Sequence, residues 1–195
     1  MGLLAEVLET ADLDYKDMSR IAAICGPGSF TGIRVGLATA RGLALGLNIP
    51  VIGINALEAI AFQHNNSENN AETPIVVALD AKRGEVFAQI FSSSGEHMTT
   101  PQAIAIDQIS DFMPDQPFRI AGSGCQAIIN AIDGQSCEVI SDQSAANIGY
   151  VARLADQMPD GSSKPSPLYL RSADAKPQNN FAVKRVSASP QQAAQ

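Results

Sequence analysis

The stretch at residues 21–47 constrains the fold of this 195-residue chain more than any other part of its sequence. It begins with the apolar run IAAIC at residues 21–25, which is long enough for one buried strand. A loop with three glycines and one proline follows at residues 26–32, and we predict a helix from residue 32 to residue 47. A strand, a glycine loop and a helix N-terminus together form a common anion site, because free N–H groups point into the loop.

Two nucleotide-binding fingerprints fail on this loop. A Walker A loop requires a lysine after its last glycine, and no lysine follows Gly32. A Rossmann fingerprint requires its third glycine where Thr31 stands, and an acidic residue at the end of the next strand, where this chain has Asn55. Two interpretations stay open: the glycines contact phosphate, or they only permit a tight turn and close packing.

Small residues form a stripe along the predicted helix. Gly32, Gly36 and Ala40 recur every four residues, and Gly42 and Gly46 repeat this spacing further along. Each glycine inside a helix costs roughly 0.5–1 kcal/mol relative to alanine. Several such costs in one helix indicate that another backbone packs closely against the stripe and offsets them.

Composition excludes several classes of protein. The net charge of −7 and the pI of about 4.7 disfavour direct, tight binding of nucleic acid. The N-terminus lacks the basic region of a signal peptide, and no apolar run reaches the roughly 18 residues of a membrane span. The three cysteines and two histidines lack metal-ligand spacing, so we expect reduced, structural thiols in a cytoplasmic protein without a metal or a cofactor.

A polar linker, HNNSENNAET at residues 64–73, divides the chain into two predicted units. In the first unit, residues 1–65, apolar residues at helical spacing predict a helix that begins near Leu3. After the central helix we predict a short buried strand. We then predict a helix that Asn55 caps, with Glu58 as the second member of a capping box.

The second unit, residues 74–171, changes to a strand pattern. Two strands joined by a turn at residues 80–84, and a third strand near His97, predict an antiparallel sheet. Alternating helices and strands follow, and Ser144 is predicted to cap the last helix. Residues 172–195 are rich in Ala, Ser, Pro, Gln and Asn, and we expect them to form a disordered tail.

Three blocks of this sequence resemble the TsaB (YeaZ) family. The first is GPGSFTGIRVGLATARGLA at residues 26–44, the second is ALDAKRGEVF at residues 78–87, and the third is PLYLR at residues 167–171. The blocks occur in the family's order across most of the chain. The resemblance implies an α/β fold of the actin-like (ASKHA, RNase H-like) class with two lobes.

The resemblance also implies that the first lobe is incomplete at its N-terminus. Members of this family usually begin with a strand and a hairpin before the helix that we predict near Leu3. The missing part would comprise about 40 residues, which is enough for strands of ordinary length. In actin-like folds the first hairpin supplies a phosphate loop, so nucleotide binding by this chain alone is not expected. The gap predicts an exposed sheet edge at residues 21–25.

The resemblance implies a non-catalytic scaffold subunit in the bacterial machinery that makes N6-threonylcarbamoyladenosine (t6A) at position 37 of tRNAs reading ANN codons. The catalytic paralogue TsaD would bind this chain as a heterodimer, and the ATPase TsaE would bind the pair. Contact with tRNA would be indirect, and the chain alone would form a homodimer. The family is also grouped with M22 peptidases, whose two-histidine metal motif has no match in this sequence.

The small-residue stripe and the resemblance together indicate a partner-binding surface. We expect TsaD to contact a set of five residues on the first helix and the central helix: Leu4, Leu8, Gly32, Gly36 and Ala40. No catalytic, cofactor-binding or metal-binding residue is predicted. The alternatives are an actin-like ATPase or small-molecule kinase that acts through residues 26–32 and Asp80, and a truncated, inactive remnant.

Overall fold

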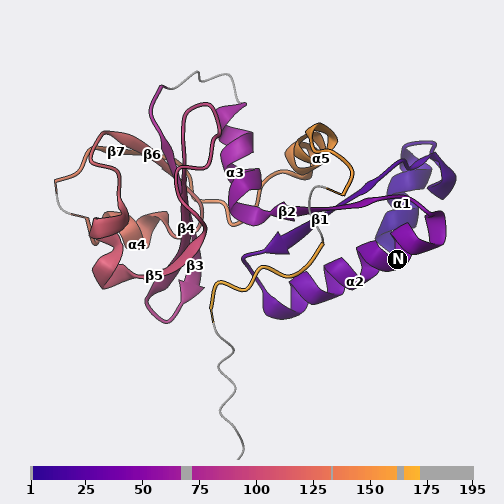
Figure 1. Cartoon of the computed structure of the whole chain (residues 1–195), viewed down its shortest axis with the longest axis horizontal. Helices are drawn as coiled ribbons and strands as arrows, with labels where there is room; N and C mark the ends of the chain where they lie inside the picture. The colour runs from indigo at the N-terminus through magenta and orange to yellow at the C-terminus, as the bar shows by residue number, and fades with distance from the viewer. Residues whose placement is uncertain (1, 67–71, 133, 162–164, 172–195) are drawn as a thin grey trace, which may run out of the picture.

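The computed structural model describes residues 2–66, 72–132, 134–161 and 165–171 (Figure 1). The predicted tail at residues 172–195 and the centre of the predicted linker lie outside these residues. The described helices and strands are α1 (Gly2–Thr10), the 3-10 helix η1 (Tyr15–Asp17), β1 (Ile21–Gly26), α2 (Phe30–Leu47), β2 (Val51–Asn55), α3 (Ala56–Asn65), β3 (Ile75–Lys82), β4 (Glu85–Phe91), β5 (Gln102–Ala105), the 3-10 helix η2 (Ile106–Phe112), β6 (Phe118–Ala121), α4 (Cys125–Ile129), β7 (Cys137–Ser141) and α5 (Ile148–Gln157).

The first sheet consists of β1 and β2, which run parallel with Ile21 opposite Val51. Helix α2 lies on one side of this sheet and α5 lies on the other (Figure 1). Ile52 and Ile54 are fully buried in a cluster with residues of α3 and α5. This sheet is therefore sandwiched between two helical layers, although it has only two strands in the described part of the chain.

The second sheet has the strand order β5-β4-β3-β6-β7. Strands β5, β4 and β3 are antiparallel neighbours, whereas β6 and β7 continue the sheet in parallel, as the sequence predicted for an RNase H-like lobe. The central strand β3 has the apolar run IVVAL, and its side chains enter one apolar cluster on each face of the sheet. Burial on both faces explains why this strand shows no polar alternation.

Helix α3 packs against both sheets. Its residues Leu57 and Ile60 belong to the apolar cluster on β3, and Ala59 belongs to the cluster on β2. At its start, the Asn55 side chain accepts a hydrogen bond from Leu57 N–H (3.0 Å) and donates one to the fully buried Gln89 (3.0 Å). The predicted cap is thus confirmed, and it also joins the two sheets.

Several local predictions were wrong. Glu58 does not complete a capping box, because its carboxylate lies 3.4 Å from His97 Nε2 instead. Residue 97 makes only a single bridge to Phe91, and the third strand of the sheet is β5. Ser144 does not cap α5, since that helix begins at Ile148 and Asn147 accepts the hydrogen bond from Gly149 N–H (2.9 Å).

Helix α2 begins two residues earlier than predicted. Ser29 is its N-cap, with Oγ accepting a hydrogen bond from Gly32 N–H (3.3 Å), so Phe30 and Thr31 are helical. The helix ends where predicted, at Leu47, with Asn48 in the left-handed conformation. In the described part of the chain, no helix combines the length and apolarity needed to cross a membrane.

The edge of β1 that faces away from β2 has no strand beside it in the described residues, in agreement with the predicted exposed edge. Ile21 N–H donates to Pro50 O on the side of β2 (3.0 Å). Because alternate residues of a strand direct their backbone groups to opposite edges, Ala23 also faces β2 and Ala22 faces the open edge. We predict that hydrogen exchange at the Ala22 amide is much faster than at the Ala23 amide. Equal protection of the two amides in the isolated chain would contradict this assignment.

The double role of Asn55 predicts a larger stability effect than loss of a helix cap alone. Asn55→Ala removes the cap of α3 and leaves the buried carbonyl of Gln89 unpaired, which should lower the free energy of unfolding by about 2–4 kcal/mol. Asn147→Ala removes only the exposed cap of α5 and should cost about 1 kcal/mol. Urea unfolding of both variants measures the difference, and equal losses would show that the Asn55–Gln89 bond contributes nothing.

Candidate functional site

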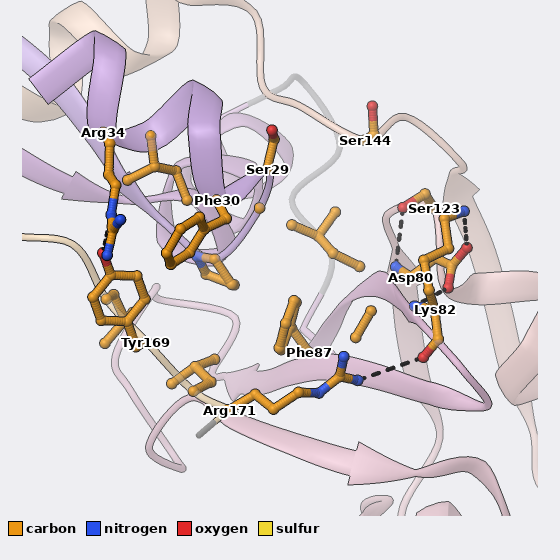
Figure 2. A pocket seen from close by; sticks show the side chains of 17 residues that line it. Ser29, Phe30, Arg34, Asp80, Lys82, Phe87, Ser123, Ser144, Tyr169 and Arg171 are labelled. Atoms are coloured by element: carbon orange, nitrogen blue, oxygen red, sulfur yellow. Dashed lines mark hydrogen bonds and ion pairs between the residues drawn. The ribbon is translucent and has the colours of Figure 1, made fainter. Parts of the chain in front are cut away.

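A cleft of about 1350 Å³ opens where the three sequence blocks meet (Figure 2). The first block supplies the loop and the start of α2, the second supplies the end of β3 and part of β4, and the third supplies the segment 165–171. The lining residues are Pro27, Gly28, Ser29, Phe30, Ile33, Arg34, Leu79, Asp80, Ala81, Lys82, Phe87, Ser123, Ser144, Leu168, Tyr169, Leu170 and Arg171. The fold therefore brings together segments that lie far apart in the sequence.

One wall of the cleft is a cluster of Arg34 with two aromatic rings. The Arg34 guanidinium lies 3.7 Å from the centroid of the Phe30 ring, and its Nε donates a hydrogen bond to the Tyr169 hydroxyl (2.8 Å). The rings of Phe30 and Tyr169 lie 5.6 Å apart, and both remain about half exposed. No local pattern indicates this contact, because Tyr169 lies 135 residues from Arg34.

The segment 165–171 ties the two sheets together across the cleft. Leu168 N–H donates to Cys25 O at the end of β1 (2.8 Å), Tyr169 contacts α2, and Arg171 forms an ion pair with Glu85 on β4. The third sequence block thus has a structural explanation, since its successive residues contact β1, α2 and β4.

Asp80 lies at the opposite wall, at the end of β3 (Figure 2). Its carboxylate accepts hydrogen bonds from the backbone N–H of Lys82 (2.7 Å) and from Lys82 Nζ (2.6 Å). These hydrogen bonds from Lys82 lower the pKa of Asp80 below its ordinary value, so the carboxylate is ionised at neutral pH. Its charge is paired with a lysine of the same turn, as expected for a turn residue.

The glycine loop shows a packing role at one position. Gly26 has a φ of +113°, and a Cβ there would lie 3.2 Å from Leu168 O and 3.0 Å from the Ile33 side chain. The backbone of segment 165–171 can approach the loop this closely only because residue 26 is glycine. This supports the packing interpretation of Gly26, whereas no observation tests the phosphate interpretation.

The thiols of Cys25 and Cys125 are buried and stay protonated at neutral pH. Burial raises the pKa of the Cys125 thiol to about 12, and burial also raises the pKa of Cys25. Both thiols are free and buried, in agreement with the predicted structural role. Within the described ranges, no group of three or more His, Cys, Asp or Glu side chains could hold a metal ion.

A second groove, of about 660 Å³, follows the predicted small-residue stripe. Leu4, Gly32, Gly36 and Ala40 line it, whereas Leu8 is half-buried and does not. A Cβ at Gly36 would meet nothing within 4 Å, so no other part of the described chain packs against this position. Ala40 is itself buried, so the exposed part of the stripe consists of Gly32 and Gly36.

Other large apolar side chains of α1 and α2 are also exposed, although Leu45 lies on the side of α2 opposite Gly36. No residue of α1 is buried, and its Leu3 side chain is 78% exposed. On α2, Val35 and Leu45 are also exposed, the latter to 85%. Large exposed apolar patches mark interaction sites in proteins, and these exposed side chains are consistent with a partner surface on the two helices. The sequence did not single out these exposed residues, because helical periodicity cannot distinguish a core face from a partner face.

A family model described as TsaD, tRNA N6-adenosine threonylcarbamoyltransferase, matches residues 1–176. The chain is 38% identical over 87 residues to the tRNA threonylcarbamoyladenosine biosynthesis protein TsaB of Escherichia coli. This match covers 45% of this chain and 37% of the relative. It is 32% identical to an uncharacterized protein of Mycobacterium tuberculosis, over 87% of this chain and 72% of the relative.

Solved structures show the same fold. YeaZ from Pseudomonas aeruginosa superposes with a TM-score of 0.69 at 22% identity, over 86% of this chain and 81% of that one. The α/β, actin-like fold is thus confirmed. The chain spans less than half the length of the E. coli relative. The matches show that the chain belongs to the TsaD family of tRNA N6-adenosine threonylcarbamoyltransferases, and they confirm its resemblance to TsaB and YeaZ.

Proposed function

We propose that this chain is a non-catalytic scaffold subunit of the t6A machinery and that it acts by binding the catalytic subunit TsaD through α1 and α2. In this proposal TsaE binds the pair formed by this chain and TsaD in the cytoplasm, and the modified base is at position 37 of tRNAs reading ANN codons. The net charge of −7 supports indirect contact with tRNA. The name of the E. coli relative supports the pathway.

The observation that supports a scaffold role is the uncovered surface of α1 and α2. Gly36 has open space where a side chain would stand, and the 39% exposed Leu4 of α1 lines the same groove. Glycines in a helix interior lower its stability, and close approach of a partner backbone would offset this cost at Gly36. The same surface explains a homodimer of the isolated chain, since two copies would cover each other's apolar residues.

The charges of the cleft support a non-catalytic role. Lys82 pairs with Asp80, Arg171 pairs with Glu85, and Arg34 is held between two aromatic rings. These contacts within the chain favour a structural role for Asp80, Arg171 and Arg34.

Gly36→Leu tests the partner surface. A Cβ at position 36 would have no neighbour within 4 Å, and leucine replaces a poor helix former, so the variant should fold and gain up to roughly 1 kcal/mol of stability. It should nevertheless lose co-purification with TsaD, because the partner backbone can no longer approach the helix.

Gly42→Leu is the matched control. Position 42 is also an open helical glycine, but it lies about 120° further round the helix and does not line the groove. This variant should keep TsaD binding with the same thermal stability as Gly36→Leu. Retained co-purification of Gly36→Leu, measured beside this control, would exclude the proposed surface.

The actin-like ATPase or kinase is the second candidate, because the cleft joins the glycine loop to Asp80. We expect isothermal calorimetry of the isolated chain with ATP or ADP to show no saturable heat, since Asp80 and Lys82 neutralise each other. The control is Asp107→Asn on the exposed surface of η2. If the chain binds nucleotide saturably, and if Asp80→Asn weakens this binding while Asp107→Asn does not, the result would favour the enzyme over the scaffold.

A further inference from the structure

We infer that Tyr169 is a positioning residue of the partner surface, because through Arg34 it holds the first two turns of α2, residues 30–36, in the orientation that a partner binds. This role rests on the proposed function, since Gly32 and Gly36 lie in the same two turns. Figure 2 shows the Arg34 side chain extending from α2 to the Tyr169 ring.

The described core holds α2 mainly by the part of the helix that follows its first two turns. The buried residues of α2 are Leu37, Ala40 and Ala44. Within residues 30–36, Ile33 is partly buried and the other six residues are exposed. Two of these six are glycines, which lower the intrinsic stability of a helix. The first two turns therefore need contacts outside this core to keep a fixed orientation.

Tyr169 supplies such a contact on the side of α2 that faces away from the groove. Its hydroxyl accepts the hydrogen bond from Arg34 Nε (2.8 Å), and its ring lies 5.6 Å from the ring of Phe30. Neither Arg34 nor Phe30 lines the groove. At 100° per residue, Arg34 lies about 160° round the helix from Gly36. Tyr169 can therefore hold the first two turns while the glycine face stays open to a partner.

The position of Tyr169 is itself fixed by its neighbours in the chain. On one side, Leu168 N–H donates a hydrogen bond to Cys25 O at the end of β1 (2.8 Å). On the other side, Arg171 forms an ion pair with Glu85 on β4. Tyr169 therefore lies between a contact with the first sheet and a contact with the second sheet. A hydroxyl placed in this way can orient α2, because its own position does not depend on that helix.

The contact acts on partner binding through the population of one helix orientation. A partner that binds one orientation loses apparent affinity in proportion to the time that the helix spends in others. Loss of the hydroxyl removes one hydrogen bond of net strength, while the aromatic contact with Phe30 stays. We therefore expect the affinity for TsaD to fall about threefold to tenfold when this bond is removed.

Tyr169→Phe in the full chain is the test, because it removes the hydroxyl and keeps the ring. Calorimetry should show the expected loss of TsaD affinity. Hydrogen exchange in the chain alone should become faster at the amides of residues 33–36 and stay unchanged at those of residues 45–47. The control is Thr99→Val, which removes the side-chain acceptor of Ile90 N–H (2.9 Å) in the second sheet. It lowers stability without touching α2, so TsaD affinity should not change.

Arg34→Met completes the test, because it removes the donor of the same hydrogen bond. The double variant with Tyr169→Phe should lose less affinity than the product of the two single losses, since both substitutions break one bond. Unchanged TsaD affinity or unchanged exchange in Tyr169→Phe, an equal affinity loss in Thr99→Val, or losses that multiply would overturn this role and leave the partner surface standing. Failure of the unaltered chain to bind TsaD would overturn the proposed function as well.

Discussion

Helix α3 is the constraint on which the rest of the structure depends, because it packs against both sheets at once. Its apolar residues enter both the cluster on β3 and the cluster on β2, so two faces of the helix are buried. Both of its ends are fixed by side chains. Asn55 joins the start to Gln89, and at the other end Asn65 accepts a hydrogen bond from the buried Arg119 (2.8 Å). Exposing either side of α3 would cost the burial of several large side chains.

The cleft is a consequence of this arrangement. With α3 holding the two sheets, the glycine loop at the end of β1 faces the turn at the end of β3. Segment 165–171 then crosses from one to the other, and its contacts with Cys25, Arg34 and Glu85 repeat the connection that α3 makes. The three blocks by which the sequence was related to a family are therefore largely the parts that join its two halves.

Local chemistry predicted most of the fold. The strands other than β5 and the helices α2 and α3 follow from apolar runs, loop glycines and the Asn55 cap, all of which act over a few residues. The errors occurred where distant residues compete for the same group. Glu58 contacts His97 rather than the start of its own helix. Asn147 caps α5, and its backbone N–H donates a hydrogen bond to the Gln63 side chain (2.7 Å). The Arg34–Tyr169 contact has no local signal at all.

The open edge of β1 and the space over Gly36 differ from the cleft, because no described part of the chain occupies them. Within the cleft, the described charges of Asp80, Arg171 and Arg34 have partners in the chain, so a charged ligand would first have to displace these contacts. The edge of β1 has no neighbouring strand in the described chain, and a Cβ at Gly36 would meet nothing within 4 Å. A partner backbone at close range would fill the space over Gly36. The surface is therefore suited to polypeptide more than to a small charged molecule.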